Sequence, residues 1–193
     1  MKFDIILAGV GGQGVLSISS IIAASALREG LYVKQSEVHG MAQRGGAVQA
    51  SLRISDQPVH SDLVPAGTAD LILSMEPVES LRYLAALSPQ GFVITASEPI
   101  ENIPDYPPVA EILARVRSLP KSRILDAAKL ARAAGSARAS NMVVIGAASA
   151  LLPVKAESLD ADIREAFARK GTHVVDTNLR AFAAGRAAVT WER

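Results

Sequence analysis

The chain has 193 residues, of which 49% are hydrophobic and 20% charged, a composition that predicts a globular protein with a substantial buried core. A formal net charge of +1 gives no basis for a nucleic-acid partner, and the absence of cysteine excludes a disulfide scaffold and thiolate metal ligands. No apolar run reaches the ~18 residues that a membrane span needs, and the N-terminus leads into a strand rather than a signal peptide. We therefore expect a cytoplasmic protein with one domain over residues 1–193 and no contact with a membrane.

A glycine-rich turn follows the first predicted strand. Residues 3–8 form an apolar, strand-like run, and residues 15–28 have the apolar faces of a helix packed on a sheet. The turn between them contains Gly9, Gly11, Gly12, Gln13 and Gly14. Glycines here permit a tight turn and let backbone N–H groups approach a ligand, while the following helix adds the positive end of its dipole. The turn therefore predicts a binding site for an anionic group.

The same spacing also fits the fingerprint of dinucleotide-binding folds. Gly9, Gly11 and Gly14 have the required separation, and Glu37 follows at roughly the ~20 residues where an acid would accept a hydrogen bond from a ribose hydroxyl. Two interpretations of the turn stay open at this point. The glycines bind a phosphate, or they only let the strand, the turn and the helix pack closely.

A second glycine loop follows the second predicted strand. That strand covers residues 32–38, and the loop reads His39-Gly40-Met41-Ala42-Gln43-Arg44-Gly45-Gly46. Residues 47–54 then alternate between apolar and polar side chains. The alternation predicts an antiparallel or edge strand in place of the crossover helix that a dinucleotide fold would have there.

The polar side chains of this second loop complete the predicted cofactor-binding set. They are Glu37, His39, Gln43 and Arg44, accompanied by Gly45 and Gly46. Arg44 either forms bidentate hydrogen bonds to a phosphate or carboxylate, or pins the loop to strand-end carbonyl groups. The sequence contains no nucleophile elbow, no paired metal-binding histidines and no P-loop lysine, so we predict no catalytic and no metal-binding residue.

The rest of the chain alternates between strands and helices. After a short extended return at 59–66, strands are predicted at 71–76, 91–97 and 123–126, and helices at 77–86, 109–116, 129–134, 141–152 and around 159–167. Asn178 is the predicted N-cap of a last helix that runs to residue 188. Glu76, at a strand end before Pro77, is either a site residue or a solvated acid. This order predicts an α/β fold with a Rossmann-like layered sheet, mostly parallel with some antiparallel strands, and a helical C-terminal region.

Three motifs carry a family resemblance: residues 9–15 of the first turn, residues 37–46 around the second loop, and Asn178-Leu179-x-Ala181-Phe182-x-x-Gly185. Together they resemble the gamma-domain subunit of 2-oxoacid:ferredoxin oxidoreductases. The second loop is more similar to the indolepyruvate branch of that family than to the pyruvate or 2-oxoglutarate branches. The resemblance covers nearly the whole chain and implies one gamma-type domain.

The resemblance implies that the chain is part of a larger enzyme. Members of this family cleave a 2-oxoacid with thiamine diphosphate, pass electrons through iron–sulfur clusters to ferredoxin and release an acyl-CoA. Because a chain without cysteine cannot supply thiolate ligands, the clusters are expected on a larger partner subunit, and by the resemblance the thiamine diphosphate as well. Coenzyme A or a loop of the partner subunit is then expected to bind at the glycine loops. Alanine-rich helices also favour a sizeable subunit interface and hence an oligomer.

Two other classes of function stay open from the residues alone. The first is a self-sufficient dinucleotide-dependent oxidoreductase, which the glycine fingerprint and Glu37 favour and the second glycine loop disfavours. The second is a non-catalytic α/β binding protein.

Overall fold

The computed structural model describes residues 1–40, 45–101 and 103–191. Within these ranges six strands form a sheet in the order β2-β3-β1-β4-β5-β6. Their bounds are β1 Lys2–Val10, β2 Tyr32–His39, β3 Ala47–Ser55, β4 Ala69–Ser74, β5 Leu87–Ala96 and β6 Ser122–Leu125. β1 and β4 to β6 run parallel, whereas β3 pairs antiparallel with both β1 and β2. The predicted mixed, mostly parallel α/β sheet is thus confirmed.

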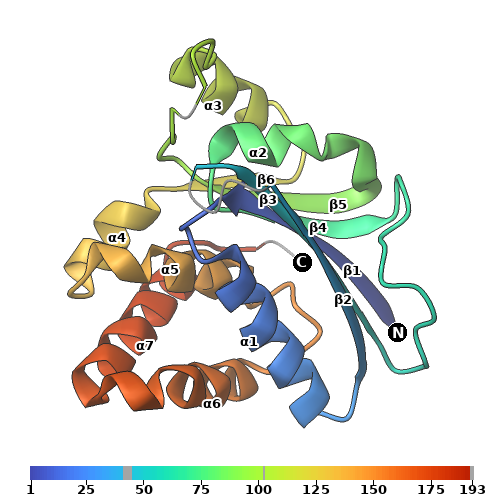
Figure 1. Ribbon diagram of the computed structural model, residues 1–193, viewed down its shortest axis with the longest axis vertical. Coiled ribbons are helices and arrows are strands. Elements are labelled where there is room, and N and C mark those ends of the chain that lie inside the picture. Colours follow the sequence, from blue (N-terminus) through green and yellow to red (C-terminus); the bar gives the residue numbers. More distant parts are fainter. Residues whose placement is uncertain (41–44, 102, 192–193) are drawn as a thin grey trace.

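Helices cover both faces of the sheet (Figure 1). One face carries α1 Val15–Arg28, α4 Ala127–Ala133, α5 Ser140–Ala148, α6 Ala156–Phe167 and α7 Thr172–Ala187, and the other carries α2 Pro77–Arg82 and α3 Val109–Arg117. Three short 3-10 helices accompany them: η1 Leu84–Ala86, η2 Ala137–Ala139 and η3 Ala168–Lys170. Because side chains alternate along a strand, Ile5 and Leu7 of β1 join the core under α1 and α5, while Ile6 joins the core under α3. None of the helices in the described ranges is long and apolar enough to cross a bilayer.

Most predicted elements lie where the sequence places them. The predicted helix 15–28 coincides with α1, and residues 47–54 form the antiparallel strand β3. β3 is an internal strand, however, and β2 is the edge strand beside it. The predicted helix 77–86 divides into α2 and η1. The predicted helix 141–152 corresponds to α5, which ends earlier than predicted, at Ala148, and whose residues from Asn141 onward are all buried.

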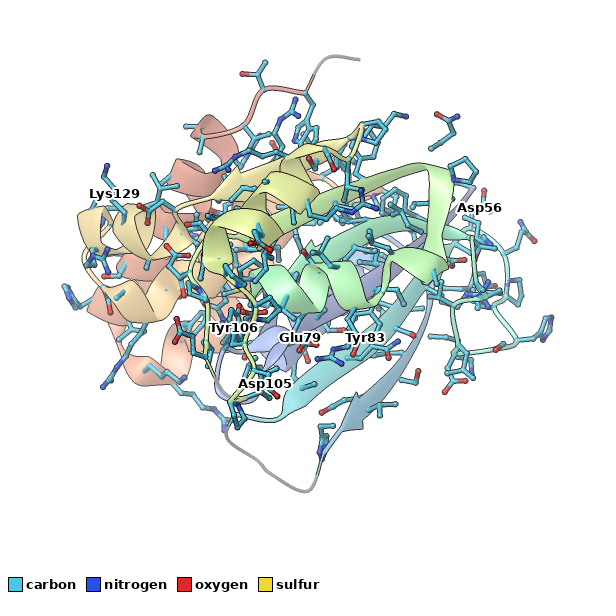
Figure 2. The ribbon with its side chains drawn as sticks, turned by 90° about the horizontal axis from the view of Figure 1, so that it is seen from above. Asp56, Glu79, Tyr83, Asp105, Tyr106 and Lys129 are labelled. Carbon is cyan, nitrogen blue, oxygen red and sulfur yellow. The ribbon has the colours of Figure 1, made fainter. Side chains whose placement is uncertain are left out.

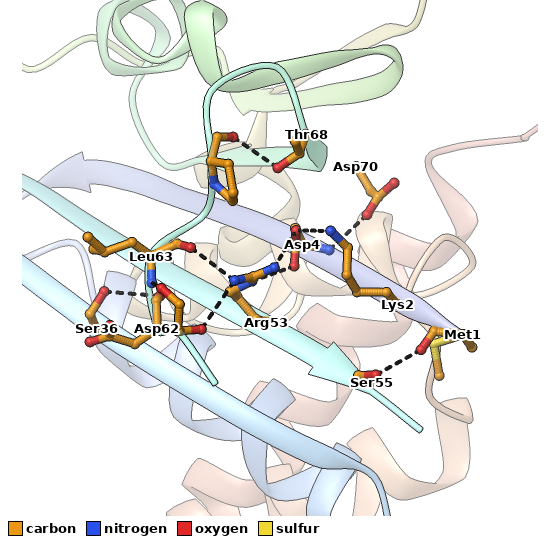
Figure 3. A network of polar contacts seen from close by, with 12 residues as sticks. Met1, Lys2, Asp4, Ser36, Arg53, Ser55, Asp62, Leu63, Thr68 and Asp70 are labelled. Carbon is orange, nitrogen blue, oxygen red and sulfur yellow. Dashed lines mark hydrogen bonds and ion pairs between the residues drawn. The ribbon is translucent and has the colours of Figure 1, made fainter. Parts of the chain in front are cut away.

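The segment between β3 and β4 is fastened by a buried ion pair (Figure 3). Asp4 is completely buried, and Arg53 Nε donates to its Oδ1 at 2.9 Å while Lys2 Nζ lies 2.8 Å from its Oδ2. The same guanidinium donates to the carbonyl oxygens of Ser61 and Leu63, both at 3.2 Å. The predicted extended return at 59–66 is not a strand of the sheet. It is held in place by the hydrogen bonds from Arg53 to its backbone.

The prediction that Asn178 caps the last helix is wrong. α7 begins six residues earlier, at Thr172, and Asn178 is buried inside it with its Nδ2 donating to the carbonyl oxygen of Val174 at 2.8 Å. The helix boundary is set by Gly171, whose φ of 94° is a conformation that favours glycine. The sequence signal for the true start was this glycine rather than the asparagine.

α5 and α7 cross in backbone contact at two glycines. A methyl group on Gly146 would collide with the carbonyl oxygen of Phe182, and one on Gly185 would collide with the carbonyl oxygen of Val143. Phe182 and Gly185 belong to the third motif of the sequence. That motif therefore has a packing role here, since only glycine lets the two helices approach so closely.

Candidate functional site

The first glycine loop connects the end of β1 with the start of α1, and its glycines serve different purposes. An added Cβ on Gly9 would lie 2.8 Å from both Gln13 Oε1 and Val15 Cγ2 and 3.1 Å from Met75 Cβ. Gly9 is therefore required by close packing of the strand, the turn and the helix. At this position the packing interpretation of the fingerprint holds.

Gln13 holds the loop together from inside. Its Oε1 accepts a hydrogen bond from the backbone N–H of Val10 at 2.8 Å, its Nε2 donates to the carbonyl oxygen of Met75 at 2.9 Å, and its own N–H donates to the carbonyl oxygen of Val10 at 3.1 Å. The amide thus links the loop to the end of β4. Its hydrogen-bonding groups are engaged within the protein, so Gln13 acts here as a support of the loop.

Gly12 presents its backbone to an open space, whereas Gly14 packs against Asn141, whose Nδ2 would lie 2.6 Å from an added Cβ. Both have positive φ, 102° and 80°, and a Cβ on Gly12 would meet nothing within 4 Å. Gly14 is the N-cap of α1 and supplies no side-chain cap. The first N–H groups of a helix have no acceptor within it, so those of Val15, Leu16 and Ser17 are available to a ligand along with the positive end of the helix dipole.

The two glycine loops are joined by backbone hydrogen bonds. The N–H of Gly11 donates to the carbonyl oxygen of Gly46 at 2.8 Å, and the N–H of Gly45 donates to that of Gly11 at 3.3 Å. Gly45 has a φ of 77°. Gln43 and Arg44, the other predicted binding residues of this loop, lie outside the described residues, so their roles stay predictions.

A cleft of about 440 Å³ opens at the N-terminus of α1. Its walls are residues of the first loop and of the first turn of α1, together with Val48 of β3 and with Glu37 and His39 of β2. His39 Nε2 lies 3.5 Å from Glu37 Oε1. The cleft therefore combines free N–H donors suited to an anion with a carboxylate suited to a hydroxyl donor.

The predicted binding residues that the structure describes divide into three groups. Gly11, Gly12, Gly14, Glu37 and His39 line this cleft. Gly9 and Gln13 support the first loop from behind, whereas Gly45 and Gly46 line a second, smaller cleft of about 200 Å³ on the other side of the joined loops.

The second cleft is built around Glu76. This carboxylate is 1% exposed, and its Oε2 caps α2 by accepting the N–H of Glu79 at 2.9 Å. Its Oε1 accepts the backbone N–H of Ile100 at 3.3 Å and a short hydrogen bond from the hydroxyl of Tyr106. Glu76 is therefore no solvated acid but the buried anchor of the proline-rich segment before α3.

Sequence reasoning missed the partners of Glu76. Tyr106 lies beside Glu79 in Figure 2, and Arg82 Nε donates to Glu79 Oε2 at 2.9 Å. Burial, and next the hydrogen bond to Glu76, raise the pKa of the Tyr106 phenol, so this tyrosine stays a hydrogen-bond donor. An acid directly before Pro77 was the available signal for a helix cap, whereas nothing local marked Tyr106 as its partner.

A pair of carboxyl groups at the ends of β5 and β6 was also missed. Glu98 Oε1 accepts the backbone N–H of Ala128 at 3.0 Å, and Asp126 caps α4 by accepting the N–H of Lys129 at 2.9 Å. Burial, and next a hydrogen bond to Asp126, raise the pKa of Glu98, while that same hydrogen bond lowers the pKa of Asp126. In the described ranges, no group of three histidine, aspartate or glutamate side chains is placed to hold a metal ion.

Residues 4–188 match the model of the family described as pyruvate ferredoxin/flavodoxin oxidoreductase. The chain belongs to this family. The matched range contains both glycine loops and the α5–α7 contact, so the family pattern extends over the site and over the helices behind it.

Among relatives in the family, indolepyruvate oxidoreductase subunits are the more similar of two groups. This chain is 39% identical over 194 residues to the subunit of Methanothermobacter thermautotrophicus, with 96% of each chain covered, and 39% identical to that of Archaeoglobus fulgidus. The common gamma subunit of the pyruvate/ketoisovalerate oxidoreductases of Thermococcus kodakarensis is 29% identical over 163 residues, covering 82% of this chain and 83% of that relative. These relatives are subunits of oxidoreductases.

Solved structures of the family have the same fold. The 2-oxoglutarate:ferredoxin oxidoreductase of Magnetococcus marinus, solved with 2-oxoglutarate, coenzyme A and succinyl-CoA bound, superposes with a TM-score of 0.77 at 25% identity. This chain covers 32% of that longer chain, and 98% of this chain is aligned. A pyruvate oxidoreductase subunit of Thermotoga maritima superposes with a TM-score of 0.75 at 23% identity, with 96% of each chain covered.

Proposed function

We propose that this chain, as one gamma-type domain over residues 1–193, is the subunit of an indolepyruvate-type 2-oxoacid:ferredoxin oxidoreductase that carries no iron–sulfur cluster. Its greater similarity to indolepyruvate oxidoreductase subunits than to the common gamma subunits supports indolepyruvate as the 2-oxoacid. The reaction of the complex would be thiamine-dependent oxidative decarboxylation to an acyl-CoA, with ferredoxin as the electron acceptor and with the complex in the cytoplasm.

The residues of this chain do not fit an iron–sulfur cluster. The sequence has no cysteine, and no described cluster of histidine and acidic side chains offers a substitute ligand set. The clusters are therefore assigned to a larger partner subunit, and the resemblance to the family assigns the thiamine diphosphate to the same subunit. This chain would shape the site beside them and hold a substrate.

One observation carries the binding role. The N-terminus of α1 has no side-chain cap, and the loop that precedes it is hydrogen-bonded to the second glycine loop. An anionic group at this point would accept hydrogen bonds from the N–H groups of residues 15–17 and would be attracted by the helix dipole. Glu37, on the opposite wall of the cleft, would accept a hydrogen bond from a hydroxyl of the same ligand. Coenzyme A has both kinds of group, and one relative was solved with coenzyme A bound.

The experiment reconstitutes the enzyme from two chains. The protein is co-expressed with a cysteine-rich, thiamine-dependent partner, and reduction of a dye by indolepyruvate and coenzyme A is measured with and without this chain. We expect activity only with both chains, and a preference for indolepyruvate over pyruvate and 2-oxoglutarate. Activity that stays unchanged without this chain would refute the proposal.

A dinucleotide-binding oxidoreductase is the second candidate, because Glu37 lies in the same cleft as Gly11, Gly12 and Gly14. Against it, β3 lies between β1 and β2 and runs antiparallel to both, so β2 is not the parallel neighbour of β1 that the dinucleotide fold requires. Titration of the isolated chain with NADH separates the two candidates. Saturable binding that is lost in Glu37→Gln would favour the second.

A further inference from the structure

A second polar cavity lies among the C-terminal helices, away from the glycine loops. It measures about 400 Å³ and lies between η2, the end of α6 with η3, and the first turns of α7. These helices share the face of the sheet that α1 covers (Figure 1). The cavity has no lining residue in common with the cleft at the N-terminus of α1, so the two are separate sites.

Three cationic or potentially cationic side chains from three different elements line this cavity. Arg138 comes from η2, Lys170 from η3 and His173 from the first turn of α7. Among the described residues that line it, there is no aspartate or glutamate. Because the whole chain has a formal net charge of only +1, this grouping of one sign of charge is local and is not expected from composition.

These side chains are free to bind a ligand. Within the described ranges, no residue accepts a hydrogen bond or ion pair from the side chain of Arg138 or His173, and Lys170 Nζ only lies over the ring of Phe167, 5.2 Å from its centroid. Arg180 next to the cavity differs, because its Nε donates to the carbonyl oxygen of Ala134 at 3.0 Å and its Nη2 to Thr177 Oγ1 at 3.2 Å. Arg180 is thus a structural arginine, whereas none of the residues that the structure describes accepts a hydrogen bond from the side chains of Arg138, Lys170 or His173.

The rest of the cavity suits an organic anion. Thr177 and Asn178 are buried polar residues in its lining whose donors are used within α7. Phe167 and Val174 add an aromatic and an aliphatic surface. α7 is 16 residues long and has no side-chain cap at its N-terminus, so its dipole adds positive potential at the same place. Phosphate groups are recognised by cations that are grouped near the N-terminal end of a helix.

We propose that this cavity binds a phosphorylated small molecule of about the size of a nucleoside monophosphate. Arg138, Lys170 and His173 hold the phosphate, and Phe167 with Val174 contacts the organic part. The site stands apart from the binding role proposed for the glycine loops and does not depend on it.

Binding of AMP and of pyrophosphate is measured by isothermal titration calorimetry, on this chain and on its complex with the partner subunit, with adenosine as the uncharged probe. We expect saturable binding of AMP with one molecule per chain, competition by pyrophosphate, and no binding of adenosine. Arg138→Gln and Lys170→Gln should each weaken the binding of AMP at least tenfold. Arg169→Gln and Arg132→Gln remove the same charge from neighbouring residues that do not line the cavity, and they should leave the affinity within twofold.

Each other outcome overturns the proposal. No binding to the chain or the complex would show that the cations have no phosphate ligand. If all four substitutions weakened AMP binding equally, AMP would be attracted by the positive charge of this surface in general and not by the cavity. Binding that survives both Arg138→Gln and Lys170→Gln would belong elsewhere, and binding lost on formation of the complex would mark the cavity as a contact for the partner subunit.

Discussion

The N–H of Gly11 donates a hydrogen bond of 2.8 Å to the carbonyl oxygen of Gly46, which joins the two glycine loops into one unit. Gly11 follows the central strand β1 and Gly46 precedes its antiparallel neighbour β3, so the sheet register itself brings the loops together. One side of this unit forms the cleft with Glu37, and the other side forms the cleft with Glu76. A change on either side is therefore expected to affect the other.

Replacing Glu37 by glutamine tests the proposed ligand contact at the glycine loops. A hydrogen bond to a charged group contributes about 1.5–3 kcal/mol, which corresponds to roughly 10–100-fold in affinity. We expect the KM for coenzyme A in the reconstituted complex to rise by about tenfold or more while kcat changes little, because the contact is made with the ground state as well. The exposed Glu157→Gln serves as the matched control. An unchanged KM in Glu37→Gln would place coenzyme A elsewhere.

Replacing Gly185 by alanine tests the contact between α5 and α7. The added methyl group would meet the carbonyl oxygen of Val143, so the helices must move apart, and overpacking of this kind costs about 1–3 kcal/mol or more. We expect a loss of unfolding free energy of that size, measured by urea denaturation, and a similar loss for Gly146→Ala. Ala183→Ser, on the exposed side of α7, should change it by less than about 0.5 kcal/mol. Gly185→Ala with wild-type stability would contradict the close approach.

Replacing Tyr106 by phenylalanine removes one donor from the buried carboxylate of Glu76. Leaving a buried acceptor without its partner costs about 1–3 kcal/mol. We expect this loss in urea denaturation, together with faster amide hydrogen exchange in the segment before α3, which Glu76 anchors through Ile100. Tyr83→Phe is the control, because no described residue accepts a hydrogen bond from its hydroxyl. Equal exchange rates in the Tyr106 variant and the wild type would remove Tyr106 as an anchor.

Replacing Glu98 by glutamine tests the carboxyl pair through pH. The pKa of Glu98 is raised in the folded state, so the folded protein binds this proton more tightly than the unfolded chain. The associated stability is fully present below the unfolded value near 4.5 and is lost as pH rises through the raised folded pKa. Glutamine resembles the protonated acid and removes this dependence. The unfolding free energy of Glu98→Gln relative to wild type should thus increase with pH across this window, whereas that of the exposed Glu111→Gln should not. A pH-independent difference would contradict the raised pKa.

Some of the site could be predicted from the sequence because it depends on local conformation. Gly12 and Gly14 adopt positive φ at a strand-to-helix turn, and glycine at such positions is a local signal. Alternation along residues 47–54 correctly indicated an antiparallel strand, because period two is a property of the strand itself. Asn178 misled the prediction since an asparagine inside a helix resembles one at its start.

The sequence by itself determined that the chain is an α/β protein without cysteine ligands, with glycine loops at two strand ends and with motifs of one oxidoreductase family. Only the tertiary structure decided that Gln13 supports the loop from inside, that Glu76 is buried against Tyr106, and that Gly185 meets α5. These features depend on residues far apart in the chain. Local patterns report backbone conformation and the face that a residue occupies, whereas the partner of a buried polar group is set by how the elements pack.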